Sequence, residues 1–350
     1  MLSDVERMRR LDTMKMFGAL YDLPEQCEEA WRLGNEAMLP LGTFKKVIVT
    51  GLGGSAIGGD LLRVYAGRRS DVPVTVNRDY VMPRYTDKET LVFAVSYSGN
   101  TEETLSAYED ARARGAVLMA LTTGGKLMEL AERDGVPVIA IPGGISPRAA
   151  TGYLFLPTVA VMYRLGLLDD PGPDYDELLN VLREWREKLK PGSPGAVNPA
   201  KQLALEFYDH LPVVWGASGT SEVVAQRWKG QINENAKAPA CWNVFPELNH
   251  NEVVGFEYPR NLLKQMHVVF LRDSGDHPRV SARMNITKSI AGGAVGGVTV
   301  IKAAGTGLLA RMYSLIYIGD YASVYLAALY GVDPGPVKII DYLKAELAKQ

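Results

Sequence analysis

The chain alternates short runs of β-branched and aliphatic residues with longer helical segments, first over residues 47–141 and again over 213–301. This alternation predicts parallel sheets whose strands are joined by crossover helices. The expected strands are VIVT 47–50, VTV 74–76, LVFAV 91–95, VLMAL 117–121, VIAI 138–141, VVW 213–215, HVVFL 267–271 and GVTVI 297–301. We therefore expect an α/β protein with doubly wound sheets.

Three segments of the first half have counterparts in the second half, in the same order. The pairs are TGLGGSAIGGDLLR 50–63 with WGASGTSEVVAQRW 215–228, LVFAVSYSGNTEETL 91–105 with VVFLRDSGDHPRVSA 268–282, and LTTGGKL 121–127 with KAAGTGLL 302–309. Matched segments in a conserved order indicate an internal duplication. The copies differ after one strand, where the second copy replaces the hydroxyls of SYSGNTEET with charges and a proline.

A chain of 350 residues is too long for one ordinary hydrophobic core, so two domains are expected. The Pro/Gly-rich stretch PGSPGAVNP, just before residue 200, is the best candidate linker. The predicted parts are a helical arm at 1–38, a first α/β domain at 39–170, a helix and linker at 171–199, and a second α/β domain with a C-terminal helix at 200–350.

Composition favours a small soluble ligand. The formal net charge is −2, which supplies no positive field to attract nucleic acid or an anionic membrane. Cys27 and Cys241 lie far apart, so neither a disulfide framework nor a thiolate zinc site is predicted. The charged N-terminus does not resemble a secretory signal. With this cysteine usage, it predicts a cytoplasmic protein. Charged residues or proline interrupt the apolar stretches 152–168 and 307–332, which predicts buried helices.

The loop SYSGNTEET follows an expected buried strand and opens an expected helix. Ser96, Ser98 and Thr101 can donate hydroxyl bonds there, and Gly99 allows the backbone to approach a ligand closely. Hydroxyls at a helix N-terminus are typical of a phosphate site. A simple helix cap would also explain Thr101 and the glutamates after it.

The segment GLGGSAIGGD at 51–60 lies in a similar position after the first strand. Its glycines partly match a dinucleotide-binding fingerprint, although that signal is weak alone and Gly58 with Gly59 is poorly suited to an early helix. In a sugar-phosphate site, Gly54 would let the backbone approach the sugar and Ser55 would donate a bond. A glycine-rich turn needed only for tight packing remains an alternative.

Other candidate residues have weaker local signals. Arg148 follows a strand and precedes an apolar run, which suits an anionic partner, although an isolated arginine is more often a surface charge.

The periodicity of a helix at 221–237 places Glu234 on one face with Arg227, Gln231 and Lys237, and a face with these polar residues is expected to be exposed to solvent. His250 lies in a polar loop, where a histidine can act as an acid or base or remain idle. No spacing indicates a metal.

At GGSAIGGD, SYSGNTEET, SPRAA, NENAK, PELNHNE and IDYLK, in that order, the sequence resembles the bifunctional phosphoglucose/phosphomannose isomerases. These belong to the sugar-isomerase (SIS) domain superfamily, and the likeness runs from about residue 40 to the C-terminus. The resemblance implies two flavodoxin-like SIS domains related by duplication. It also implies that Ser96, Ser98 and Thr101 hold the substrate phosphate, while Gly54 and Ser55 approach the sugar.

The resemblance further implies an aldose–ketose isomerase that converts glucose 6-phosphate, and mannose 6-phosphate, to fructose 6-phosphate. Glu234 would move a proton between C1 and C2, Arg148 would stabilise the cis-enediolate, and His250 with Lys344 would assist ring opening. The family implies a homodimer in which the histidine reaches the partner's site, and no cofactor is required. Near Lys344, Gly335 stands where a hydroxyl would be expected in an enzyme that also uses mannose 6-phosphate.

Three other readings remain open. A non-catalytic sugar-phosphate sensor would commonly carry a DNA-binding module, and the first 40 residues are neither basic nor patterned as one. The isomerase part of an amidotransferase would be fused to a glutaminase domain. A nicotinamide-dependent oxidoreductase would bind its nucleotide in a fluorescence titration.

Overall fold

The computed structural model describes residues 2–347 and 349, which form two compact units. We call Asp22–Leu182 with Gly305–Arg311 the N-terminal unit. Met1–Tyr21, Arg183–Ala304 and Met312–Gln350 make up the C-terminal unit. The residues expected to form an N-terminal arm are divided between the two units. The exact domain boundaries given above stay a prediction.

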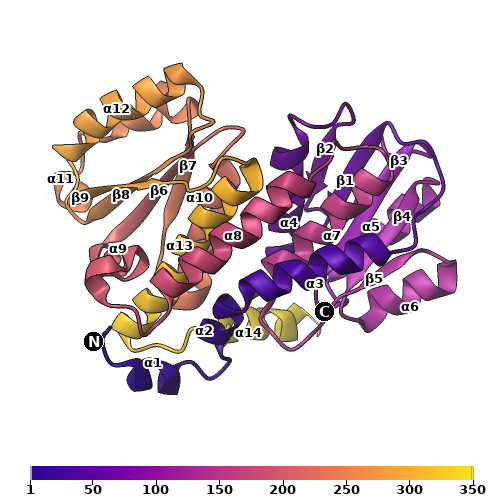
Figure 1. Cartoon of the computed structure of the whole chain (residues 1–350), viewed down its shortest axis with the longest axis horizontal. Coiled ribbons are helices and arrows are strands. Elements are labelled where there is room, and N and C mark those ends of the chain that lie inside the picture. The colour runs from indigo at the N-terminus through magenta and orange to yellow at the C-terminus, as the bar shows by residue number, and fades with distance from the viewer. Residues whose placement is uncertain (1, 348, 350) are drawn as a thin grey trace. The chain divides into compact units, whose positions relative to one another are not determined.

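A five-stranded parallel sheet forms the centre of the N-terminal unit, in the order β2-β1-β3-β4-β5 (Figure 1). Its strands are β1 Lys46–Thr50, β2 Val74–Asn77, β3 Thr90–Ser96, β4 Val117–Thr122 and β5 Val138–Ala140. The first four contain the aliphatic runs that predicted them, and β5 contains all but the last residue of VIAI 138–141. Every residue of β3 is buried. The prediction of a parallel, doubly wound sheet is confirmed.

Helices cover this sheet because their apolar faces need a partner. The helices are α3 Leu23–Glu36, α4 Gly54–Ala66, α5 Glu102–Ala113, α6 Gly125–Asp134, the short η1 Pro147–Ala149, and α7 Thr151–Arg164. Side chains of α5 and α6 share one core with Ile48, Val92 and Leu118 of the sheet. The helices α3 and α4 pack on α7, whose first twelve residues are all buried.

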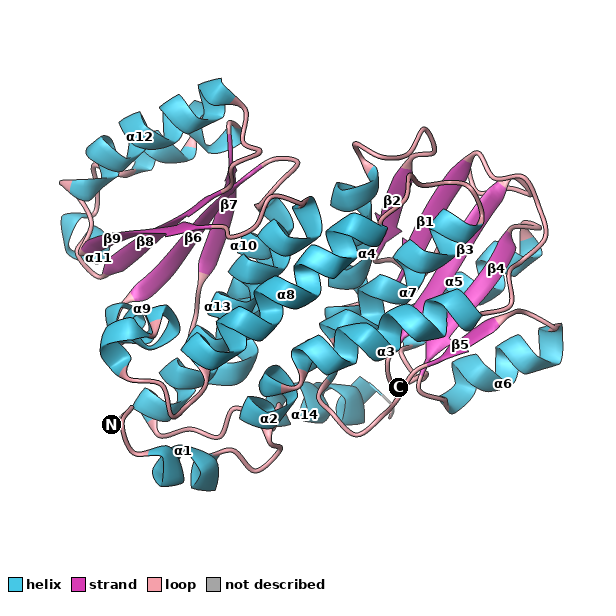
Figure 2. Cartoon of the chain, viewed as in Figure 1, coloured by secondary structure: helices cyan, strands magenta, loops and turns pink. Residues whose placement is uncertain are grey.

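The C-terminal unit contains a four-stranded parallel sheet in the order β7-β6-β8-β9 (Figure 2). Its strands are β6 Leu211–Ala217, β7 Cys241–Phe245, β8 Met266–Arg272 and β9 Gly297–Lys302. The order repeats β2-β1-β3-β4, as a duplication predicts. Strand β7 was not predicted, because this edge strand exposes Cys241 and Trp242 and therefore lacks an apolar run.

The remaining helices belong to the C-terminal unit, except that α8 and α13 are divided between the two units. They are α1 Val5–Leu11, α2 Met16–Tyr21, α8 Gly172–Leu189, η2 Gly195–Val197, α9 Pro199–Phe207, α10 Glu222–Gln231, η3 Ile232–Ala236, η4 Glu247–His250, η5 Glu252–Gly255, α11 Arg260–Leu263, α12 Pro278–Gly292, α13 Leu308–Tyr330 and α14 Lys338–Leu347. Helix α13 is largely buried, as its apolar sequence predicts. Within the described residues, no helix combines the length and apolar character needed to cross a membrane.

One expectation about α4 was wrong. The helix runs through both Gly58 and Gly59, and their lack of a side chain is what lets it pack. A Cβ on Gly58 would lie 2.3 Å from the carbonyl oxygen of Leu154, and one on Gly59 would lie 2.8 Å from Cβ of Val49. Close approach to α7 and β1 therefore compensates for the poor helix propensity of glycine.

This packing predicts that Gly58→Ala lowers the free energy of unfolding by about 1–3 kcal/mol, because the backbone of α7 cannot move aside easily. Gly230→Ala in α10 is the matched control, since a Cβ there meets nothing within 4 Å. We expect the control to be neutral or to stabilise the protein by up to about 1 kcal/mol. Thermal unfolding of both variants measures the difference, and equal midpoints would contradict this account of α4.

Candidate active site

The loop between β3 and α5 places hydroxyl groups at a helix N-terminus. Ser96, the last residue of β3, is buried, and its Oγ lies 2.9 Å from Oγ1 of Thr101. Thr101 occupies the N-cap position of α5, yet its side chain makes no capping bond. Capping alone therefore does not account for Thr101. Ser98, between them, is exposed at the surface of the loop.

Gly99 lets this loop pack closely against the loop that follows β4. It has a φ of +68°, and a Cβ there would lie only 1.7 Å from the carbonyl oxygen of Gly124. The Gly99 N–H donates to the Ser96 carbonyl at 3.1 Å, and its carbonyl accepts from Leu127 N at 2.9 Å. Any other residue would push the two loops apart, so the hydroxyl groups depend on this glycine.

The loop between β1 and α4 lies against the hydroxyl loop. The Tyr97 N–H donates to the buried Oγ of Ser55 at 3.4 Å. Gly54 faces the turn that carries Arg148, because a Cβ on Gly54 would lie 2.9 Å from the Pro147 carbonyl oxygen and 3.5 Å from Cα of Arg148. Gly54 and Ser55 therefore connect the hydroxyl loop with the segment after β5.

Arg148 lies in η1, directly before the buried helix α7. Only 6% of its surface is exposed, so the reading of Arg148 as a surface charge is wrong. An arginine side chain stays positively charged in proteins, and burying a charge costs free energy. A buried arginine is therefore a candidate for a functional role that needs a fixed positive charge. The N-terminal unit thus groups one cation with the glycine loop and the hydroxyl loop at the carboxyl edge of its sheet.

Glu234 lies in η3, a π-helical turn that continues α10. The face of α10 predicted to be solvated is instead buried, because Arg227 is 4% and Gln231 is 2% exposed. Arg227 Nε and an η nitrogen donate to the Asp320 carboxylate of α13 at 3.0 and 2.6 Å. Burial raises the pKa of Asp320, and the Arg227 charge opposes that shift. The periodicity argument failed because α13 covers this face.

The π-helical turn is fixed on both sides of Glu234. On one side, the buried Asn235 amide donates to Ser323 Oγ of α13 at 2.8 Å. On the other, Lys237 has a left-handed φ of +58°, and its Nζ donates to the Glu234 carbonyl at 2.5 Å. Turns of this kind occur frequently at functional sites. The Glu234 side chain itself is half-buried.

Glu234 lines a cavity of about 580 Å³ within the C-terminal unit. Lys237 lines it as well, together with a largely apolar segment at residues 332–340 that leads into α14. His250, at the end of η4, and Lys344, on α14, are both exposed. Neither is among the described residues that line this cavity.

The predicted site residues are shared between the two units. Gly54, Ser55, Ser96, Ser98, Thr101 and Arg148 belong to the N-terminal unit, whereas Glu234, His250 and Lys344 belong to the C-terminal unit. The structure brings members of the first group together through the contacts described above. The second group is distributed over η3, η4 and α14.

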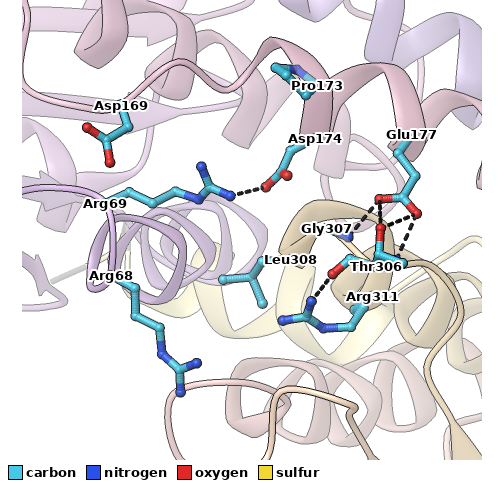
Figure 3. A pocket seen from close by; sticks show the side chains of 10 residues that line it. All are labelled: Arg68, Arg69, Asp169, Pro173, Asp174, Glu177, Thr306, Gly307, Leu308 and Arg311. Carbon is cyan, nitrogen blue, oxygen red and sulfur yellow. Dashed lines mark hydrogen bonds and ion pairs between the residues drawn. The ribbon is translucent and has the colours of Figure 1, made fainter.

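A cavity of about 550 Å³ in the N-terminal unit was not anticipated from the sequence (Figure 3). The Glu177 carboxylate accepts hydrogen bonds from the backbone amides just before α13, from Thr306 N at 2.7 Å and from Gly307 N at 2.6 Å. Burial alone would raise the pKa of Glu177, but the hydrogen bonds from Thr306 and Gly307 have the larger combined effect, so the pKa is lowered. Arg69 pairs with Asp174 at 2.8 Å. The described lining holds three cations and three carboxylates, so its charges balance: Arg68, Arg69, Arg311, Asp169, Asp174 and Glu177.

Among the described residues, no group of three or more His, Cys, Asp or Glu side chains is arranged to hold a metal ion. The candidate groups of the N-terminal unit are hydroxyl groups and one buried guanidinium. The C-terminal unit contributes one half-buried carboxylate, Glu234.

Two family models match the chain, the SIS domain over residues 43–143 and the bacterial phospho-glucose isomerase C-terminal SIS domain over residues 196–347. In solved structures, the fold is similar to a hypothetical protein of Thermus thermophilus, with a TM-score of 0.73 and 20% identity over 98% of this chain and 93% of that one. A glucose-6-phosphate isomerase like protein of the same organism has a TM-score of 0.60 and 19% identity, covering 91% of this chain and 97% of that one.

Similarity in sequence is much higher among curated relatives. The chain is 53% identical to a bifunctional phosphoglucose/phosphomannose isomerase of Caldicellulosiruptor bescii, over 95% of this chain and 99% of the relative. It is 38% identical to the protein of that name from Aquifex aeolicus, over 88% of this chain and 92% of the relative. With identity at this level across both units, the chain belongs to the bifunctional phosphoglucose/phosphomannose isomerase family.

Proposed function

We propose that this protein is an aldose–ketose isomerase that interconverts glucose 6-phosphate and mannose 6-phosphate with fructose 6-phosphate. The observation that carries this function is the 53% identity to a bifunctional isomerase over nearly the whole of both chains. None of the relatives described above favours a non-catalytic sensor. The arrangement of polar groups in each unit agrees with the chemistry that such a reaction needs.

The hydroxyl loop binds the phosphate of the substrate in this proposal. Ser96, Ser98 and Thr101 donate to its oxygens, and the N-terminus of α5 adds favourable backbone dipoles. The buried hydroxyl of Ser96 and the half-buried hydroxyl of Thr101 support this role, since they already lie 2.9 Å apart. Gly54 and Ser55 contact the sugar. Phosphate binding away from the reacting carbons positions the substrate for proton transfer.

Glu234 acts as the single base of the isomerisation. Its carboxylate takes the proton from C2 of the open-chain aldose, and the electron pair forms a cis-enediolate between C1 and C2. The same carboxyl group returns the proton to C1 while the proton of the C2 hydroxyl passes to O1, which yields the ketose without net change in the enzyme. Arg148 stabilises the negative oxygen of the enediolate with a charge that does not change protonation. The rigid π-helical turn around Glu234 supports this role.

His250 and Lys344 assist opening of the sugar ring, with His250 supplied by the second subunit of a homodimer. Large apolar side chains are exposed close to His250 in sequence, including Val254 at 69% and Tyr258 at 70%. Soluble proteins seldom leave such side chains grouped at a surface without a partner. This exposure supports the proposal that a second copy covers the His250 segment.

Replacement of Glu234 tests the base. Glu234→Gln should lower kcat for both products of fructose 6-phosphate by about 100-fold to 10,000-fold, the usual contribution of a general base. Coupled assays for glucose 6-phosphate and mannose 6-phosphate measure the two activities. Sorbitol 6-phosphate, which has no carbonyl to isomerise, should bind the variant as it binds the wild type. The control Glu132→Gln changes an exposed carboxylate of α6 and should stay fully active.

If Glu234→Gln retained either activity, a single base for both reactions would be ruled out. An inert wild-type protein that still bound sorbitol 6-phosphate would instead favour the non-catalytic sensor.

Removal of one hydroxyl tests the phosphate loop. Thr101→Val keeps the shape of the side chain and should lower kcat/KM by about 10-fold to 100-fold, mainly through KM, because a hydrogen bond to a charged group is lost. Ser106→Ala removes another hydroxyl of α5, one that donates to the Tyr80 carbonyl at 2.9 Å, and should leave kinetics unchanged. Equal effects of the two substitutions would argue against a phosphate role for Thr101.

Mixing two inactive variants tests the shared site. Each site of a mixed dimer would combine Glu234 of one chain with His250 of the other. Dimers formed from Glu234→Gln and His250→Ala chains would therefore contain one intact site. After dissociation and reassociation of equal amounts, we expect about a quarter of wild-type activity, since roughly half the dimers are mixed and each has one working site. Activity no higher than the average of the two variants would place His250 in its own subunit's site.

A further inference from the structure

The second sheet carries a cavity of about 630 Å³ that the proposed isomerase reaction does not use. It lies in the C-terminal unit, where β8 and β9 end, and α12 contributes part of its lining. Three cations line it, Arg272, Lys288 and Lys302, together with the hydroxyl groups of Ser274 and Ser281. A cavity of this volume accommodates a small metabolite. Its lining shares no residue with the cavity of Glu234.

The register of the sheet brings two of these cations together. Arg272 at the end of β8 pairs directly with Lys302 at the end of β9, so their side chains leave the sheet on the same face. On α12, Ser281, Asn285 and Lys288 are spaced by four and three residues and share one helix face. An η nitrogen of Arg272 donates to Asn285 Oδ1 at 2.7 Å, which fixes the guanidinium toward α12.

The charges of this cavity are not balanced. Asp273 is its one carboxylate among the described lining residues, so three cations less one carboxylate leave a net charge of +2. Asp273 is also buried and accepts from Gly275 N at 2.6 Å. Both lysines are exposed, and neither forms an ion pair with any described carboxylate. The whole chain has a formal net charge of −2, so the excess is local.

Like charges gathered around one cavity repel one another, and a bound anion removes that repulsion. The Glu177 cavity of the N-terminal unit has no such excess of positive charge, and the Glu177 carboxylate already accepts from the backbone amides of Thr306 and Gly307. The hydroxyl loop after β3 differs too, because it offers neutral donors. Three cations favour a dianionic phosphate over a singly charged carboxylate.

We propose that Arg272, Lys288 and Lys302 form a second anion site, which binds a small molecule through a phosphate or pyrophosphate group. The site occupies the position at which the second copy of the duplicated sequence replaces the hydroxyls of SYSGNTEET by charges. Together with the phosphate loop of the proposed function, this gives each copy of the duplicated sequence an anion site at a strand end, built from different groups. Arg272 contacts the anion from the sheet, Lys302 from the neighbouring strand, and Lys288 from α12.

Protection of the lysines against acetylation tests the site locally. The full-length protein is treated with an acetylating reagent at increasing inorganic pyrophosphate, with ionic strength held constant by potassium chloride, and modified peptides are quantified by mass spectrometry. Bound pyrophosphate should slow acetylation of Lys288 and Lys302 by about fivefold or more, because their amino groups are engaged. Lys88, an exposed residue of the N-terminal unit, should react at an unchanged rate.

A matched pair of variants separates a defined site from general screening. Lys302→Gln should raise the pyrophosphate concentration that half-protects Lys288 by about tenfold, since one charge-assisted contact is lost. Arg279→Gln removes an exposed cation of α12 that does not line the cavity and should leave that concentration unchanged. Equal protection of Lys88, or the same half-protecting concentration in Lys302→Gln and wild type, would overturn the proposal.

Discussion

Every strand of both sheets runs parallel to its neighbours, and the rest of the molecule depends on that constraint. In a parallel sheet each strand must be followed by a crossover, so all loops that lead from strand to helix lie at one edge. The hydroxyl loop after β3, the glycine loop after β1 and the Arg148 turn after β5 are three such loops. Groups that are far apart in the chain meet there, and they meet because the sheet is parallel. The close fit of those loops in turn requires glycine at positions such as Gly99.

The C-terminal unit uses a buried polar interface to hold its candidate base. Arg227 and Asp320 are 4% and 1% exposed, and removing one partner of such a pair leaves an uncompensated buried charge. Asn235 bonds to Ser323 along the same face, one residue from Glu234. These bonds hold α10 and the π-helical turn against α13, and Glu234 belongs to that turn. Buried pairs of this kind contribute to a defined geometry more than to net stability.

The duplicated halves have kept one topology and changed its chemistry. The order β2-β1-β3-β4 recurs as β7-β6-β8-β9. After the third of these strands, one copy presents neutral hydroxyls and the other presents charged residues beside a basic cavity. At the start of α13, the backbone amides of Thr306 and Gly307 donate to Glu177, a carboxylate of the protein itself. Strand-end loops can thus carry hydroxyl groups, cations or amides that are paired with a carboxylate of the protein, while the fold stays the same.

The sequence by itself determined the fold class, the duplication and the candidate residues, because hydrophobic periodicity and the residue types of strand-end loops are local properties. It predicted eight of the nine strands, and it missed β7 because an exposed edge strand has no apolar run. Tertiary structure alone decided that Arg148 is buried, that Gly58 and Gly59 belong inside α4, and that the face of Arg227 and Gln231 is covered by α13. Those outcomes depend on which element packs against another, and contacts between distant segments leave no periodic signal in either segment.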